Sequence, residues 1–260
     1  MSDGEIRRIW PVGAVTDAAH AASDDEIAEW YSVSDRSRRW ARVNFVSSLD
    51  GSATHAGRSG GLGDTADRRV FDVLRRLCDV VVVGAGTVRA EGYGPMRVDE
   101  PAAVWRRAHG LAEHPVFALV SARLELDPAS RIFTDAPVRP IIVTVDAAPR
   151  ERRAALSKVA DVITCGVASV NTSAMVDALA ERGLVQVHCE GGPHLFGTMI
   201  ADGTVDELCL TMSAQLEGGS GPRISNGSEL PASRGMHLAQ VLASGNTLLL
   251  RYMRQGSLVE

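Results

Sequence analysis

Residues 185–198 have a composition suited to phosphate binding, because a carboxylate is followed by glycines that carry no side chain. A short, partly apolar run rich in β-forming residues ends at Glu190, and Gly191, Gly192 and Pro193 follow before a helical pattern begins. Amides at the start of a helix, with no Cβ to block approach, can donate hydrogen bonds to a phosphate. A strand end with a flexible corner is the alternative, but two adjacent glycines before a helix-starting proline favour a phosphate site.

A second strand also ends in glycines. The run Val80–Val83 leads into Gly84, Gly86 and Thr87, where the threonine hydroxyl can cap a helix or bind a phosphate oxygen. Arg89 replaces the third glycine of G-x-G-x-x-G, so the dinucleotide fingerprint is incomplete and a simple tight turn is an equal alternative. Two glycine-lined strand ends in one chain nevertheless predict a dinucleotide that spans both.

The segment after the first predicted strand also has two interpretations. Ser48-Leu-Asp-Gly51 is followed by a stretch rich in glycine and serine at 52–63. An Asp-Gly turn in a surface loop explains this composition. An unstructured loop of this length is often functional, so a lid over a bound ring is the alternative prediction.

The predicted helix 65–77 carries two carboxylates near its start. Asp64 is explained by helix capping. Asp67 precedes Phe71 by four residues and therefore borders the apolar face, where it could hold a ring N–H. Arg75 lies further along the same side, where pairing with a substrate anion or with Asp72 is possible, but the sequence alone favours a solvated surface position.

Metal chemistry is not expected. The segment His188-Cys-Glu190 imitates the H-x-E of zinc deaminases, but the P-C-x-x-C partner is missing. The four cysteines form no C-x-x-C pair, and most lie in or beside apolar runs. They are interpreted as buried thiols in a reducing compartment.

Composition narrows the class of protein. The 260 residues have a formal net charge of −5, with 45% hydrophobic and 23% charged residues. The negative charge argues against a nucleic-acid partner. No apolar run approaches the roughly 20 residues that span a bilayer, and the N-terminus lacks a signal-peptide pattern. We expect a cytoplasmic protein with no membrane partner.

From residue 40 onward, predicted strands and helices alternate. This order predicts an α/β fold with a mostly parallel central sheet flanked by helices, closed by an antiparallel hairpin around Ser244-Gly245-Asn246. The expected strands are 40–47, 79–83, 116–120, 141–145, 162–164, 185–190, 205–212, 237–242 and 247–253; the expected helices are 65–77, 87–91, 149–156, 172–182 and 193–201. We predict an N-terminal extension at 1–39 and one domain at 40–260.

In this order, the motifs resemble the reductase domain of the bacterial riboflavin pathway, which reduces 5-amino-6-(5-phosphoribosylamino)uracil. The matching segments are 48–51, 79–87, 190–195 and 205–208, and the resemblance covers roughly residues 40–255. It implies a dihydrofolate-reductase-like fold, NADPH as cofactor, a small heterocyclic substrate and a homodimer. The single domain 40–260 would then be an NADPH-dependent reductase.

The resemblance also implies roles for individual residues. The pyrophosphate would bind at the turn and helix start formed by Gly191, Gly192, Pro193, His194, Leu195, Phe196, Gly197 and Thr198. The remainder of the cofactor would contact Val46, Ser48, Gly61, Gly84, Gly86, Thr87 and Glu91, with Ser121 and Arg123 beside its 2′-phosphate. The substrate would contact Asn44, Ser59, Asp67, Arg75, Arg97 and Glu190. Asp67 and Glu190 are the predicted catalytic residues, and both would bind ring N–H groups.

Two other functions stay open. Asn44 stands where the family tends to have lysine, and Asp67 lies on the helix where dihydrofolate reductases carry their pteridine-binding carboxylate. Reduction of dihydrofolate is therefore one alternative. A non-catalytic NADP-binding module is the other, and S-adenosylmethionine is a possible ligand of such a domain.

Overall fold

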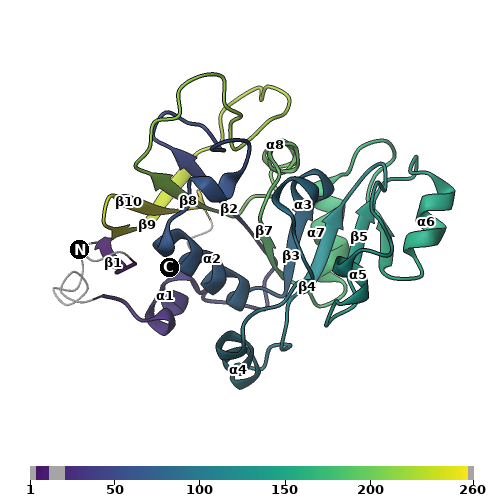
Figure 1. Ribbon diagram of the computed structural model, residues 1–260, viewed down its shortest axis with the longest axis horizontal. Helices are drawn as coiled ribbons and strands as arrows, with labels where there is room; N and C mark the ends of the chain where they lie inside the picture. The colour runs from purple at the N-terminus through teal and green to yellow at the C-terminus, as the bar shows by residue number, and fades with distance from the viewer. Residues whose placement is uncertain (1–3, 12–20, 257–260) are drawn as a thin grey trace.

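A computed structural model describes residues 4–11 and 21–256. Its described strands form one sheet in the order β1-β9-β10-β8-β2-β7-β3-β4-β5-β6 (Figure 1). The strands are β1 (Arg7–Trp10), β2 (Trp40–Ser48), β3 (Val80–Gly84), β4 (Val116–Val120), β5 (Ile141–Thr144), β6 (Asp161–Thr164), β7 (Gln186–Cys189), β8 (Glu207–Ser213), β9 (Met236–Ser244) and β10 (Thr247–Arg254).

Pairing within the sheet is parallel from β8 through β6, and antiparallel among β8, β10, β9 and β1. The predicted α/β class, with a mostly parallel sheet and a closing antiparallel hairpin, is confirmed. The helices are α1 (Asp24–Tyr31), η1 (Ser59–Gly61), α2 (Thr65–Leu77), α3 (Ala85–Glu91), α4 (Glu100–Ala108), α5 (Arg131–Thr134), α6 (Arg150–Leu156), α7 (Thr172–Ala180) and α8 (Pro193–Asp202).

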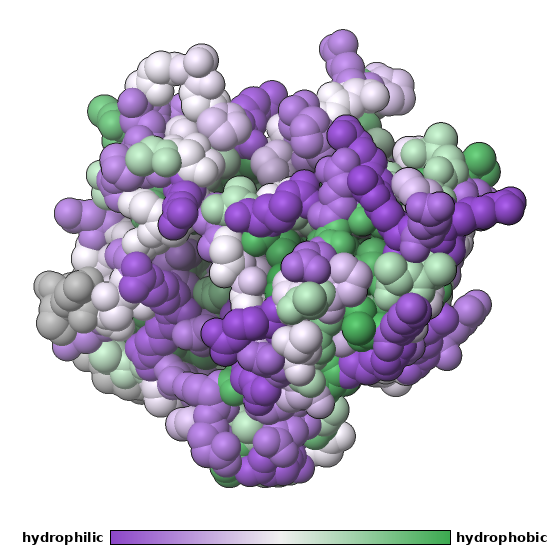
Figure 2. All heavy atoms as spheres, turned by 45° about the vertical axis from the view of Figure 1, so that its right-hand side comes forward, coloured by the Kyte–Doolittle hydropathy of each residue, from purple (hydrophilic) through white to green (hydrophobic). Residues whose placement is uncertain are grey.

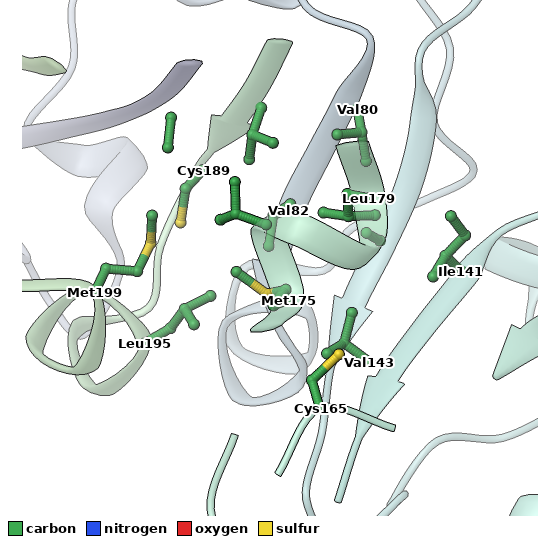
Figure 3. Packing of buried hydrophobic residues seen from close by; sticks show 14 of the residues in the cluster. Val80, Val82, Ile141, Val143, Cys165, Met175, Leu179, Cys189, Leu195 and Met199 are labelled. Carbon is green, nitrogen blue, oxygen red and sulfur yellow. The ribbon is translucent and has the colours of Figure 1, made fainter. Parts of the chain in front are cut away.

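The four valines of β3 are fully buried because helices cover both faces of the parallel half. Val80 and Val82 face α7 and α8, where Met175 and Met199 complete the packing shown in Figure 3. The alternate valines face the opposite cluster, to which α3, α5 and α6 contribute. The strands that carry the glycine turns are therefore held rigidly on both sides.

The N-terminal residues join the fold instead of only lying over it. β1 pairs with β9 at the sheet edge, and α1 packs against α2. A buried Glu207 on β8 accepts hydrogen bonds from Arg42 and Arg251, which also donate to backbone oxygens at the end of α1. Residues 1–3 and 12–20 of the predicted extension lie outside the described residues, and the domain division stays a prediction. No helix in the described ranges has both the length and the apolar character required to cross a bilayer.

Candidate active site

The two glycine turns found in the sequence lie against each other at the carboxyl ends of β3 and β7. The Gly84 N–H donates to the Gly191 carbonyl oxygen over 2.8 Å, and the Glu190 N–H donates to the Val82 oxygen over 3.0 Å. The Gly191–Gly192 peptide bond is cis. Because β3 and β7 are parallel neighbours, their ends meet at the same edge of the sheet.

Two cavities open on either side of this junction, with volumes of about 530 and 600 Å³. Gly86, Thr87, Gly192 and Pro193 line both cavities, so these residues form the saddle between them. On the face seen in Figure 2, apolar residues show in recesses bordered by hydrophilic side chains. A ligand with two ring systems joined by a narrow linker could occupy both cavities and cross the saddle.

The saddle has no room for a side chain at Gly192. A Cβ on Gly192 would lie 2.3 Å from Thr87 Oγ1, well inside van der Waals contact. Gly192 is also the N-cap of α8, and no side chain caps the helix there. Pro193 has no N–H, so the first amides of α8 are those of His194 and Leu195, which line the second cavity, and the positive end of the helix dipole adds to their attraction for an anion.

Helix α2 supplies one wall of the first cavity. Asp64 caps the helix by accepting the Asp67 N–H over 2.9 Å, which fixes the first turn. Asp67, Phe71 and Arg75, spaced at four-residue intervals, all line the cavity. This spacing places them in one row along the helix, as the sequence predicted for Asp67.

Arg75 and Glu190 form a bidentate ion pair between α2 and the end of β7. Arg75 Nε and Nη2 donate to the two carboxylate oxygens over 2.6 and 2.8 Å, and the Tyr93 hydroxyl donates to Oε2 over 3.0 Å. The guanidinium lies 4.3 Å from the centre of the Phe71 ring. Burial and the adjacent Glu190 raise the pKa of Tyr93, which keeps the phenol protonated as a donor.

Asp67 has a different environment at the other end of the row. Burial raises the pKa of its carboxyl above the ordinary 3.8, although a hydrogen bond from Thr211 on β8 acts in the opposite direction. The positive charge of the neighbouring Arg68 also favours the ionised form, although no ion pair within 4 Å joins Asp67 to an arginine or lysine in the part of the chain that the structure describes. Such a carboxylate is a strong acceptor for an N–H group that a ligand would bring.

Most of the chain matches the model of one protein family. A model of the RibD C-terminal domain matches residues 39–250. The chain belongs to this family. This match confirms the resemblance to the riboflavin-pathway reductase domain that the motifs indicated.

Several members of known description are similar over nearly their full length. The chain is 30% identical over 225 residues to the 2,5-diamino-6-ribosylamino-4(3H)-pyrimidinone 5′-phosphate reductase of Methanothermobacter thermautotrophicus, covering 84% of this chain and 100% of the relative. The reductase of the same description from Archaeoglobus fulgidus is 26% identical over 219 residues, with the same coverage. Among solved structures, a pyrimidine reductase-like protein from Corynebacterium diphtheriae superposes with a TM-score of 0.76 and 29% identity over 83% of this chain and 92% of the other.

Within this RibD C-terminal domain, most of the predicted site residues line one of the two cavities. The first cavity contains the predicted substrate contacts and part of the cofactor set: Asn44, Val46, Ser59, Asp67, Arg75, Glu91, Glu190 and Gly191. The second contains Gly84, Ser121, Arg123, His194, Leu195 and Thr198. The saddle contains Gly86, Thr87, Gly192 and Pro193. The structure thus brings together residues that are far apart in the sequence.

Five predicted contacts do not line either cavity. Arg97 is exposed, and its guanidinium donates to the Asp135 carbonyl over 2.6 Å. Ser48 is fully buried, and its hydroxyl donates to Asp50 over 2.5 Å and accepts from the Ser52 N–H, so it shapes the turn.

The other three have different surroundings. Phe196 stacks on Phe45 with ring centres 4.8 Å apart. Gly197 lies so close to another segment that a Cβ would come within 2.2 Å of the Asn226 oxygen. Gly61 is exposed beside His55.

The loop at 52–63 does form a wall of the first cavity, through Ala53, Thr54, Gly57, Ser59 and Gly60. Asp50 connects it to a second loop, which contains Gly218 and Pro222, by accepting the Gly218 N–H over 2.7 Å. The hydrogen bonds from the Ser48 hydroxyl and from the Gly218 and Glu217 N–H groups lower the Asp50 pKa to about 2. Pro222 of the second loop lines the same cavity. The two loops therefore cover the cavity together, whereas closure as a lid stays a prediction.

Sequence reasoning missed Tyr93 and Arg68 as parts of the site. Tyr93 reaches Glu190 from 97 residues away, just after the short helix α3. No local sequence pattern predicts a contact between residues so far apart. Arg68 follows Asp67 on α2 and lines the first cavity, and the helical spacing that singled out Asp67 and Arg75 could have included it.

His188 is buried below the ion pair, with its Nε2 3.6 Å from Glu190 Oε1. Burial lowers its pKa to about 4, so the ring is neutral near pH 7. Neither ring nitrogen has a hydrogen-bond partner among the described atoms. Within the described chain, no cluster of three or more His, Cys, Asp or Glu could hold a metal ion.

Proposed function

We propose that this protein uses NADPH to reduce a ribosylaminopyrimidine 5′-phosphate, the class of substrate in the names of its archaeal relatives. The observation that carries the proposal is the pair of cavities joined by the Gly86–Thr87 and Gly192–Pro193 saddle. Full-length similarity to two reductases of the same description supports it. The cofactor, the site residues and the exact pyrimidine are parts of the proposal.

The residues at the saddle and in the second cavity fit NADPH. Gly192 carries no side chain beside the first turn of α8 and the Thr87 hydroxyl, so the backbone there stays open to a pyrophosphate. Ser121 and Arg123 line the second cavity and supply a hydroxyl and a guanidinium for the 2′-phosphate. The nicotinamide would then enter the first cavity beside Val46.

The first cavity would hold and orient the pyrimidine. Asp67 accepts a ring N–H at one end of the α2 row. Glu190 already accepts three hydrogen bonds, two from Arg75 and one from Tyr93, which leaves about one of its roughly four acceptor positions for the substrate. The ion pair thus fixes the direction of the remaining acceptor. Asn44 and Ser59 complete the polar lining.

When bound, NADPH supplies a hydride to an electrophilic carbon of the substrate, the ribose C1 in its imine form. The protein contributes orientation and electrostatics. Phe71 and Val46 exclude water from the walls of the cavity, while Asp67 and Glu190 hold the ring N–H groups. No side chain has to act as a strong acid, because water can return a proton to the nitrogen.

A second candidate is the reduction of dihydrofolate. The observation that favours it is the Asp67 carboxylate, half-buried on α2 and held by Thr211, since a pterin presents neighbouring N–H donors to one carboxylate. The neutral Asn44 in the same cavity is compatible with either ring. A third outcome is an NADP-binding module without turnover.

One assay separates the three outcomes. Purified protein is mixed with NADPH and either the ribosylaminopyrimidine phosphate or dihydrofolate, and loss of the reduced nicotinamide absorbance is followed. Turnover with the pyrimidine alone supports the proposal, and turnover with dihydrofolate alone replaces it by the second candidate. NADPH binding without turnover of either compound would leave a binding module, and S-adenosylmethionine would be the next ligand to titrate.

We also propose a homodimer in the cytoplasm. One face of the β8–β10–β9 strands packs on α1 and α2, but the opposite face carries Leu248 at 40% exposure and the partly exposed Leu250, opposite Met212 and Leu210 of β8. A second copy is the occupant that would bury this apolar row. The four cysteines are buried and unpaired, as suits a reducing compartment.

A further inference from the structure

Helix α2, which forms one wall of the first cavity, is held at its carboxyl end by an arginine of another helix. Arg106 lies on α4, and α4 packs against α2 with the Arg76 guanidinium 4.0 Å from the centre of the Trp105 ring. The Arg106 side chain is completely buried, at 0% exposure. Within the described ranges, each of its hydrogen bonds goes to a backbone carbonyl oxygen and none goes to a carboxylate. The guanidinium is therefore a buried cation held by backbone oxygens.

These oxygens belong to the end of α2 and to the segment after α4. Nη1 lies 2.6 Å from the Cys78 oxygen, 3.0 Å from the Arg76 oxygen and 3.3 Å from the Arg75 oxygen. Nε donates to the Ala112 oxygen over 2.7 Å. The last carbonyls of a helix have no partner within the helix, and they attract a cation. One side chain thus ties together three of the four residues that end α2 and lead out of it.

Capping alone does not require a buried guanidinium. Burial lowers the pKa of Arg106, so holding the charged form inside the protein costs free energy. Helix ends are commonly closed by water, by a glycine turn or by an exposed lysine or arginine, without that cost. The buried charge therefore points to a requirement for precision at the end of α2.

The end of α2 carries Arg75, whose ion pair with Glu190 connects this wall of the cavity to the end of β7. Nε lies 2.6 Å from Oε1, and Nη2 lies 2.8 Å from Oε2. Two parallel hydrogen bonds require both groups to be fixed in position and direction. Glu190 is fixed by its strand, since its N–H donates to the Val82 oxygen, whereas Arg75 is fixed by the turn of α2 that Arg106 holds. A displacement of this turn would move the guanidinium away from the carboxylate.

We propose that Arg106 is a positioning residue of the first cavity: by holding the last turn of α2, it keeps Arg75 in bidentate contact with Glu190 and so keeps the carboxylate that faces the substrate in place. The inference rests on the proposed function for its effect on catalysis, but its structural part can be measured without turnover. At the other end of the helix, Thr247 of β10 donates to the capping carboxylate of Asp64 over 2.6 Å. The two ends of α2 are thus each held by a side chain of another element.

The test replaces Arg106 and measures Arg75 directly. Arg106→Met keeps a long side chain and removes the charge and the donors, whereas Arg106→Lys keeps the charge. Arg153→Met is the matched control, because Arg153 also donates from Nη2 to a backbone oxygen, that of Val145, over 2.6 Å, but lines neither cavity. The measured quantities are the Tm, the kcat/KM for the ribosylaminopyrimidine phosphate, the Kd for NADPH, and the rate at which the Arg75 Nε–H exchanges with solvent. Proton–nitrogen NMR gives this rate, and the signal is assigned by its loss in Arg75→Lys.

Arg106→Met should lower kcat/KM on the order of tenfold, because the Arg75–Glu190 pair loses its geometry, and leave the Kd for NADPH unchanged. Exchange of the Arg75 Nε–H should become faster by about tenfold or more, since the buried pair opens more often. Arg106→Lys should recover part of both effects. Arg153→Met should lower the Tm without changing kcat/KM or the exchange rate.

Two results would overturn the inference: an Arg75 Nε–H that exchanges as slowly in Arg106→Met as in wild type, or equal kinetic losses in Arg106→Met and Arg153→Met. If Arg106→Met does not fold, Arg106→Gln, which keeps a neutral donor, is compared with the same control and should show both effects. Failure of the proposed function gives a different result. Wild type that oxidises no NADPH with the pyrimidine would refute the reductase proposal, and the exchange rates would still support or overturn the link between Arg106 and Arg75.

Discussion

The guanidinium of Arg75 on α2 and the carboxylate of Glu190 after β7 meet in a bidentate pair, 115 residues apart in the sequence. The pair joins a helix that forms the cavity wall to the strand end that begins the glycine turn. Glu190 is followed directly by Gly191 and Gly192, so the ion pair also fixes the approach to the saddle. The substrate wall and the cofactor seat are therefore connected through one contact.

Glu190→Gln should weaken both folding and catalysis. The amide removes the charge opposite the largely buried Arg75, at a cost on the order of 3 kcal/mol of unfolding free energy. The kcat/KM should fall at least about tenfold, because Arg75 and Tyr93 lose a charged acceptor. Denaturant titration and steady-state kinetics measure the two effects.

Asp161→Asn is the matched control for this variant. It breaks an ion pair of similar length, 2.8 Å to Arg139, but both partners are about half exposed. Its cost should stay below about 1 kcal/mol. Equal losses of stability in the two variants would show that the Arg75–Glu190 pair has no special role.

Gly192→Val should abolish tight NADPH binding. A Cβ at this position would lie 2.3 Å from Thr87 Oγ1, so the branched side chain must displace Thr87 and distort the turn assigned to the pyrophosphate. Each phosphate hydrogen bond that is lost should weaken the affinity about tenfold or more. Fluorescence titration with NADPH gives the Kd.

Gly94→Ala is the control glycine substitution, because Gly94 lines the first cavity away from the saddle and a Cβ there meets no atom within 4 Å. It should keep the NADPH affinity of wild type. If Gly192→Val also titrates like wild type while remaining folded, the pyrophosphate does not bind at this turn.

The regular elements were predictable because their patterns are local. Four consecutive valines indicated the doubly buried β3, and the apolar spacing of residues 65–77 matched α2 at both ends. The missed helices α1 and α4 begin with recognisable caps, Ser23 with Glu26 and Asp99 before a proline, but their short apolar patterns are weak. The caps of α1 and α4 could be recognised in the sequence. The packing of both helices on α2, which stabilises them, could not.

The site was predictable where it follows strand ends and unpredictable where it depends on side-chain partners. The glycines after β3 and β7 had to meet once the two strands were parallel neighbours. Arg75 was expected to be solvated, which is wrong, because the distant Glu190 and Tyr93 enclose it. Arg97, predicted to contact the substrate, donates to the Asp135 carbonyl oxygen and does not line either cavity. The spacing of residues along the sequence predicts neither the contact of Arg75 with Glu190 nor that of Arg97 with Asp135.

Arg123→Ala should separate NADPH from NADH. Arg123 lines the second cavity and is exposed there. Removing a guanidinium that binds the 2′-phosphate should raise the Kd for NADPH about tenfold or more and leave the Kd for NADH unchanged. Arg139→Ala, on the surface beside β6, serves as the charge control. A parallel rise for both coenzymes would place the 2′-phosphate elsewhere.

Asp67→Asn should make the protein more stable at neutral pH and less active. Burial raises the native pKa of Asp67 above the ordinary 3.8 of the unfolded chain, so the native state binds this proton more tightly. Ionisation therefore costs folding stability as the pH rises between these two values, and the cost persists at higher pH. The uncharged amide avoids the cost, so its gain in Tm should be present at pH 7 and disappear below the ordinary pKa.

The same titration should appear in the wild-type kinetics. Only the ionised Asp67 accepts the substrate N–H, so kcat/KM should fall as the pH decreases through the raised pKa, and Asp67→Asn should be low across the whole range. Its Kd for NADPH should equal that of wild type, because Asp67 lies in the first cavity away from the saddle. Equal loss of NADPH binding and turnover, together with a lower Tm, would instead show that Asp67 only supports the fold.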